Sequence, residues 1–246
     1  MKAHKLYSKS YKMKKNLLLP FCVILFSCAE LQTIAEQVTE DTGMVSDAQI
    51  SSGLKQALQF GIDHQVTKLT AEDGFFTNEL VKIALPEELS KVDSALRKIG
   101  LGNLADEGLK LMNAAASDAV KEATPIFVKA IKDMTITDAR NILMGGNSAA
   151  TQFLQQKTSD ELYQKFYPVV DDSFGKVGAD QIWTTAINKY NTLPFTEDVN
   201  NNLTEYVTQQ TLEGVFTMIA VEESKIRTNL QSRTTDLLQK VFTLQD

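Results

Sequence analysis

The chain has 246 residues, of which 43% are hydrophobic and 23% are charged. This composition excludes collagen-like, intrinsically disordered and polytopic membrane proteins, and the length suits one large domain or two small ones. The net charge of −6 is unevenly distributed, because residues 1–27 hold six lysines and no acidic residue. Removing these six from the 25 basic residues leaves 19 against 31 acidic residues, a net charge of −12. Nucleic acid is therefore not an expected partner, since its phosphates repel so acidic a body.

The first segment, residues 1–27, is predicted to be a lipoprotein signal peptide. Two lysines precede an apolar run at residues 17–26, which is too short to cross a bilayer as a helix. The run ends in LFSC at residues 25–28, which resembles the bacterial lipobox and implies cleavage before Cys28 and acylation of its sulfur. The alternatives are a plain secretory signal or a buried apolar helix. The order Met-Lys-Lys-apolar run begins at Met13, so either Met1 or Met13 is the start.

Residues 28–45 are polar and are predicted to be a lipidated tether between the membrane and the domain that follows. Cys22 leaves with the signal and Cys28 carries lipid, so we expect no disulfide in the processed chain. Several acyl chains anchor a protein firmly, whereas one alone is marginal. Ala29 is not the aspartate that favours retention in the inner membrane of enteric bacteria. The expected location is therefore the bacterial cell envelope, on the periplasmic face of the outer membrane.

From residue 46 onward, apolar residues recur at helical spacing. A capping-box pattern at Ser46 and Gln49 opens a helix whose apolar stripe runs to Leu69. A loop follows, and residues 80–85 alternate weakly, which predicts a short extended arm or a brief β-hairpin. The next helices are expected at residues 86–99, with Gly100 as C-cap, at 104–121, and from 124 to about 134.

The second half of the chain continues the helical pattern. Thr137 is expected to cap a short helix, residues 158–161 form another capping-box pattern, Pro168 is expected to kink its helix, and Asn202 to cap a long one. The expected helices lie at residues 138–144, 147–157, 160–190, 203–227 and 234–242. The fold class is therefore all-α, a compact multi-helix bundle, in a single domain at residues 46–246.

Several short motifs follow one another along this predicted domain. They are DGF at 73–75, MNAAA at 112–116, DARNIL at 138–143, YVTQQTLEGVFTMIAVEESKIR at 206–227 and RTTDLLQKVF at 233–242. In their order and spacing they resemble the bacterial lipoprotein family catalogued as domain of unknown function four-one-nine-seven, over about residues 47–242. One departure is the absence of an expected proline at residues 229–231, which alters a turn. The resemblance implies an exported, mostly helical protein and supplies no activity.

Few residues of the processed chain suit catalysis or metal binding. His64 is the one histidine left after removal of the signal, which excludes a Cys/His zinc site in a monomer. Carboxylate pairs at 171–172 and 222–223 are chemically able to bind Ca²⁺ or Mg²⁺, although no loop has EF-hand spacing. We expect no cofactor and assign no catalytic residue.

A polar cluster is predicted around the scarce arginines. The chain has 25 basic residues, of which four are arginines, and Arg140, Arg227 and Arg233 lie in the family-like motifs. Glu222 and Glu223 extend an apolar run, so at least one is expected to be partly buried and to need a cation. Glu223 and Arg227 form an i,i+4 pair, and Arg140 or Arg233 is placed to reach Glu222 across helices. The interpretations are a buried ion-pair network that docks the last helix, or an anion- or metal-binding cleft that also includes Asp73.

Three functions remain open at this point. The first is a lipid-anchored helical module that binds an envelope protein or a small ligand. The second is an enzyme that uses acidic residues, with or without a divalent metal. The third is a carrier that holds an apolar ligand between its helices. The lipid anchor, the acidic body and the absence of a recognisable catalytic motif favour the binding module.

Overall fold

The computed structural model describes residues 45–177, 179–192, 194 and 203–245. The predicted signal, Cys28, the tether up to residue 44 and the cap at Asn202 lie outside these residues. The described part is helical and contains no strand, which confirms the all-α prediction. Its elements are α2 (Asp47–Thr70), α3 (Glu87–Lys98), α4 (Gly102–Ala119), η1 (Val120–Glu122), α5 (Ala123–Asp133), α6 (Ile136–Leu143), α7 (Ala149–Val177), α8 (Ala179–Asn191), α9 (Thr204–Thr228), η2 (Leu230–Ser232) and α10 (Asp236–Phe242).

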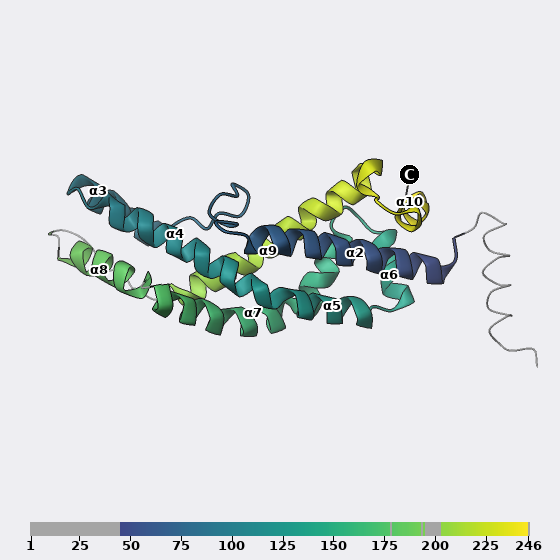
Figure 1. Cartoon of the computed structure of the whole chain (residues 1–246), viewed down its shortest axis with the longest axis horizontal. Helices are drawn as coiled ribbons and strands as arrows, with labels where there is room; N and C mark the ends of the chain where they lie inside the picture. The colour runs from purple at the N-terminus through teal and green to yellow at the C-terminus, as the bar shows by residue number, and fades with distance from the viewer. Residues whose placement is uncertain (1–44, 178, 193, 195–202, 246) are drawn as a thin grey trace, which may run out of the picture. The chain divides into compact units, whose positions relative to one another are not determined.

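Residues 45–246 form one compact unit in which α9 packs along α7, α2 and α4. Helix α2 also contacts α5, α6 and α10, while α4 contacts α3, α7 and α8. The start of α2, α6 and α10 therefore lie at one end of this unit, and α3 and α8 lie at the other (Figure 1). A continuous apolar core connects the two ends.

The predicted cap of α2 is present. Ser46 Oγ accepts a hydrogen bond from the backbone N–H of Gln49 at 3.2 Å, and Gln49 Oε1 accepts one from the backbone N–H of Ser46 at 2.9 Å. This reciprocal pair satisfies two amides that have no partner inside the helix. The stripe that follows, from Ile50 to Leu69, is buried as the spacing predicts.

Gly100 follows the end of α3, but it is the residue after the C-cap; the C-cap itself is Ile99. Gly100 has a φ of 82°, its N–H donates to the Arg97 carbonyl, and the N–H of Leu101 donates to the Leu96 carbonyl. These two hydrogen bonds make a Schellman motif, which needs a left-handed residue directly after the cap. At the other end of α3, Pro86 is the N-cap and Glu87 begins the helix.

Residues 80–85 form no hairpin. Instead, the buried side chain of Asn113 on α4 accepts a hydrogen bond from the Ile83 N–H at 2.8 Å and donates one to the Ile83 carbonyl at 3.0 Å. One amide side chain thus satisfies the backbone of this segment in place of a second strand. Before it, the fully buried Phe75 packs against α9 at Gly214, where a Cβ would lie 2.7 Å from the ring.

Two predicted helix starts are wrong. Thr135, not Thr137, caps α6, because Asp138 lies three residues after Thr135 and completes its capping box. The expected boundary at residues 158–161 does not exist, because α7 runs without a break from Ala149 to Val177. Thr158 is buried inside α7, and its hydroxyl donates to the Leu154 carbonyl at 2.7 Å. A threonine within a helix bonds the carbonyl four residues earlier in this way, instead of capping a helix start.

Pro168 lies inside α7 without ending it. Its missing N–H would have paired with the Gln164 carbonyl, and both residues are exposed, so water is able to hydrate that carbonyl. The helix ends at Val177 rather than continuing to residue 190, and α8 follows from Ala179. Helix α9, expected up to Arg227, ends at Thr228.

Candidate functional site

The Glu223 carboxylate is buried on α9 and binds the first turn of α7. It accepts hydrogen bonds from the backbone N–H groups of Ala150 at 2.9 Å and Thr151 at 2.8 Å. The hydroxyl of Thr151 donates a third at 2.7 Å. The first amides of a helix have no partner within it and carry partial positive charge, so a carboxylate is well placed there.

Arg227 lies one turn further along α9 and is equally buried. Its guanidinium donates to Glu223 Oε1 through Nε at 2.9 Å and Nη2 at 2.8 Å. It also donates to the last carbonyls of α6, Ile142 at 2.8 Å and Leu143 at 3.2 Å. The negative end of α6 therefore receives a cation, as the helix dipole favours.

Arg233 is the third charged residue here and is only 1% exposed. Its Nε and Nη2 donate to the Ile226 and Arg227 carbonyls, both at 3.1 Å, near the end of α9. The guanidinium carbon lies 5.6 Å from the centre of the Phe242 ring of α10. We call Glu223, Arg227 and Arg233 the helix-end junction, because each binds the end of a helix.

Glu222 points elsewhere, toward α2. Its carboxylate accepts a hydrogen bond from Gln65 Nε2 at 2.6 Å and lies 3.3 Å from His64 Nδ1. Lys225 Nζ is 3.7 Å away. The expected partners Arg140 and Arg233 do not reach it, because Arg233 is directed at the α9 carbonyls.

Two further predicted site residues lie apart from the helix-end junction. Arg140 on α6 is exposed and pairs with Asp47 at the start of α2. Asp73, in the loop after α2, has a φ of 55° and lies 3.5 Å from Lys110 of α4. The structure therefore groups Glu223, Arg227 and Arg233, of which Glu223 and Arg227 form a buried ion pair, and it places Arg140 and Asp73 apart from them.

An apolar pocket adjoins the helix-end junction between α2, α9 and α10. Leu54, Ile62, Ile219 and Phe242 are among its lining residues, with Glu223 and Arg227 in one wall, and its cavity measures about 30 Å³. A cavity of this size holds about one water molecule, whereas benzene needs a cavity of about 150 Å³. This pocket therefore offers no room for a lipid chain.

Larger hollows lie on the surface, and no sequence motif predicted them. A groove of about 450 Å³ runs between α7 and α9. Its lining residues are Gln155, Ser159, Gln209, Leu212, Glu213, Phe216, Thr217 and Ala220. Only Glu213 among them is charged. We call this surface the α7/α9 groove. Helical spacing alone did not reveal it, because a groove depends on how two helices pack.

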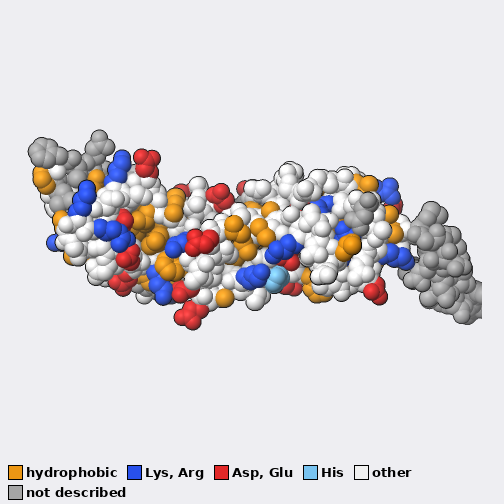
Figure 2. Space-filling model, turned by 90° about the horizontal axis from the view of Figure 1, so that it is seen from above, with side chains coloured by type: hydrophobic (Ala, Val, Ile, Leu, Met, Phe, Trp, Pro, Cys, Tyr) orange, Lys and Arg blue, Asp and Glu red, His pale blue; other side chains and the backbone are white. Residues whose placement is uncertain are grey.

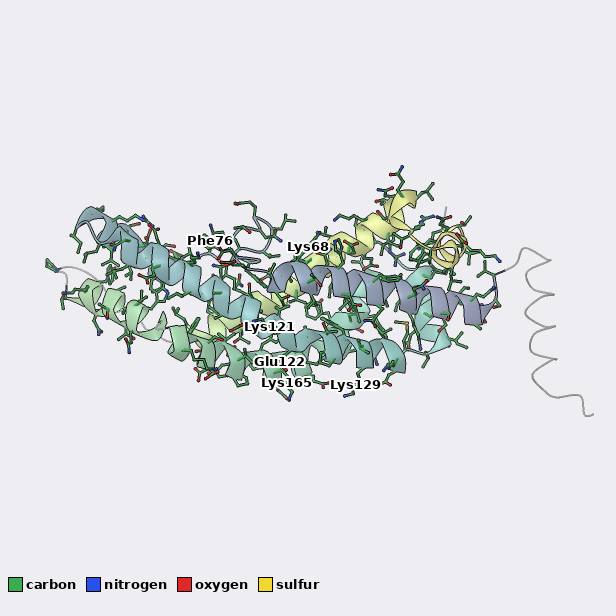
Figure 3. The ribbon with its side chains drawn as sticks, viewed as in Figure 1. Lys68, Phe76, Lys121, Glu122, Lys129 and Lys165 are labelled. Atoms are coloured by element: carbon green, nitrogen blue, oxygen red, sulfur yellow. The ribbon has the colours of Figure 1, made fainter. Side chains whose placement is uncertain are left out.

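A second hollow of about 370 Å³ lies between α5, α6 and α7 and is rich in charge. Lys129 on α5, labelled in Figure 3, is 3.3 Å from Glu161 on α7, and Lys157 also lines the hollow. On the face seen in Figure 2, acidic, basic and hydrophobic side chains are likewise interspersed. Within the described part of the chain, no three His, Cys, Asp or Glu side chains are grouped as metal ligands would be.

Comparison with known proteins gives a family and nothing more specific. The family described as "Protein of unknown function (DUF4197)" matches residues 44–243. Comparisons with curated proteins and with solved structures yield no match. Among the described helices, none combines the length and apolar character that a membrane crossing requires.

Proposed function

The chain belongs to the family of proteins of unknown function DUF4197, and we propose that it is a lipid-anchored protein of the bacterial cell envelope whose helical domain binds another envelope protein. The anchor is supported by the residues before the domain. Two lysines, a ten-residue apolar run and the sequence LFSC lead to Cys28, in the order of a lipoprotein signal.

The α7/α9 groove is the observation that carries the binding function. It lies open between two long helices whose buried sides belong to the core, so its walls are fixed before a partner arrives. Leu212, Phe216 and Ala220 recur every fourth residue of α9. Leu212 and Ala220 are half-buried and offer apolar contact, and the buried Phe216 lies between them as the floor of the groove. Glutamine, serine and threonine side chains flank them. An apolar strip with a neutral, hydrogen-bonding rim is typical of surfaces that bind a protein segment.

The groove suits a protein better than a small molecule. Small ligands are mostly held in concave pockets that enclose most of their surface. The α7/α9 groove is instead an open hollow between Gln155 and Ser159 of α7 and residues 209–220 of α9. Because a rigid surface loses little conformational entropy on binding, even a moderate contact area gives useful affinity.

Site-specific cross-linking tests this proposal. A photoreactive residue at Gln209, in the groove, is expected to capture one envelope protein in living cells. The same residue at Gln164, exposed on another side of α7, is expected to capture none. The captured protein is then purified and titrated against the wild-type chain and the Gln155→Lys variant.

We expect saturable, stoichiometric binding that Gln155→Lys weakens at least tenfold and that the matched control Gln164→Lys leaves unchanged. Both side chains are exposed on α7, so neither substitution should alter folding. Equal cross-linking at the two sites, or equal binding by the two lysine variants, contradicts the proposal.

A further inference from the structure

Exposed apolar side chains are concentrated at one end of the described domain. Its large exposed hydrophobic residues are Phe60, Leu80, Ile99, Ile136, Met144, Leu230 and Leu244. The last four of these lie at the start of α6, at its C-cap, on η2 and in the turn after α10, at the end where α2 begins (Figure 1). This distribution points to a surface that is covered in the cell.

Helix α6 carries the centre of this surface. Ile136 and Arg140 of α6 and its C-cap Met144 follow one another at intervals of four residues, so they share the outer side of this helix and its end. Ile136 is 50% exposed and Met144 63% exposed. The opposite side of the helix, including Ala139 and Ile142, is buried in the core. We call Ile136, Arg140 and Met144 the α6 outer stripe.

The C-terminal turn extends this stripe. Gln245 donates a hydrogen bond to the Leu143 carbonyl at the end of α6. Its neighbour in the chain, Leu244, is 45% exposed and so lies near the end of α6 that carries Met144. The turn therefore adds a further apolar side chain beside the stripe.

The chain from the predicted anchor enters the domain at the same place. Asp47, at the start of α2, pairs with Arg140 in the middle of the α6 outer stripe. Residues 28 and 45 are 17 positions apart, a reach of at most about 60 Å for a fully extended chain. Such a tether gives an effective concentration on the order of millimolar, so a weak contact with the membrane suffices.

We propose that the α6 outer stripe rests on the lipid surface that holds the acyl chains of Cys28. This inference depends on the proposed anchor and adds the orientation of the domain. Ile136 and Met144 enter the boundary between headgroups and acyl chains, as apolar residues of interfacial helices do. The contact with Asp47 uses one terminal nitrogen of Arg140, and the other guanidinium N–H groups donate to lipid phosphates.

Fluorescence quenching on vesicles tests the orientation. The full processed chain, with Cys28→Ser and an N-terminal histidine tag, is bound to vesicles of phosphatidylethanolamine, phosphatidylglycerol and a nickel-chelating lipid. A fluorophore is attached to Met144→Cys in one sample and to Ile99→Cys, at the far end of the domain, in another. Nitroxides on the acyl chains are expected to quench the first label at least threefold more than the second.

A further variant tests the apolar contact. Ile136→Asp, added to the labelled Met144→Cys chain, is expected to abolish the excess quenching while leaving the melting temperature unchanged, because residue 136 is exposed. Equal quenching of the two labels overturns the proposal. A second outcome also overturns the proposal. If the Met144→Cys label is shielded from solvent in the absence of vesicles, and the protein has twice the mass of one chain, a second copy covers the stripe. Since the tag replaces the lipid, these results do not depend on whether Cys28 is acylated.

Discussion

Glu223 and Arg227 lie one turn apart on α9, and together they hold the beginning of α7 and the end of α6 against that helix. The carboxylate faces amides and the guanidinium faces carbonyls, so each charge meets the helix end of opposite partial charge. Because both groups are buried, their mutual hydrogen bonds compensate the loss of water. The pair therefore fixes the relative positions of three helices.

Removing the cation from this pair should destabilise the domain strongly. Arg227→Met leaves the Glu223 carboxylate buried without its cationic partner and removes one donor each from the Ile142 and Leu143 carbonyls. We expect the free energy of unfolding in urea to fall by about 3–5 kcal/mol. Arg140→Met is the matched control, since it breaks an exposed pair with Asp47 and should cost below about 1 kcal/mol. Equal effects of the two substitutions would disprove a structural role for the buried pair.

The close approach of Phe75 to α9 predicts that Gly214 tolerates no side chain. A Cβ at residue 214 would lie 2.7 Å from the Phe75 ring and 3.3 Å from Val81. Gly214→Ala should therefore lower the free energy of unfolding by about 1–3 kcal/mol through overpacking. Gly175→Ala, in α7, meets no atom within 4 Å and should raise it by about 0.5–1 kcal/mol, because alanine favours a helix. Chemical denaturation of both variants measures this contrast, and stabilisation by Gly214→Ala would contradict the packing.

A surface contact between α7 and α9 should be visible in the titration of tyrosine. The hydrogen bond that Tyr163 donates to the Glu205 carboxylate raises the pKa of the phenol to about 12. The carboxylate favours the protonated phenol and disfavours the phenolate, so Glu205→Gln should lower this pKa. Ultraviolet absorbance during alkaline titration follows the ionisation, and Tyr163→Phe identifies the step that belongs to this residue. An identical titration of wild type and Glu205→Gln would rule out the contact.

The helical class and the cap at Ser46 followed from the sequence because both depend on neighbours within four residues. Thr158 shows where this reasoning fails. Its capping-box pattern is genuine, but Leu154, Leu162 and Phe166 on either side of it are all buried, and their packing keeps α7 continuous. The free energy of burying these side chains outweighs that of one cap.

In the candidate site, too, contacts between near neighbours were predictable and contacts between distant residues were not. The i,i+4 pairing of Glu223 with Arg227 was predictable from spacing alone. The hydrogen bonds from Thr151 to Glu223 and from Arg227 to Leu143 were not predictable. The two residues of each pair are 72 and 84 positions apart in the sequence and meet only in the folded chain. For the same reason the sequence assigned Glu222 an arginine partner, whereas the structure places Gln65 beside it.

The lipid anchor is the central claim, and the mass of the N-terminal peptide tests it most directly. Protein purified from membranes should yield a peptide that begins at residue 28 and carries acyl chains on Cys28. The Cys28→Ser variant should lack these chains and leave the membrane fraction. A free Cys28 thiol in an unprocessed chain, or a Cys28→Ser variant that stays in the membrane with unchanged mass, would contradict the account.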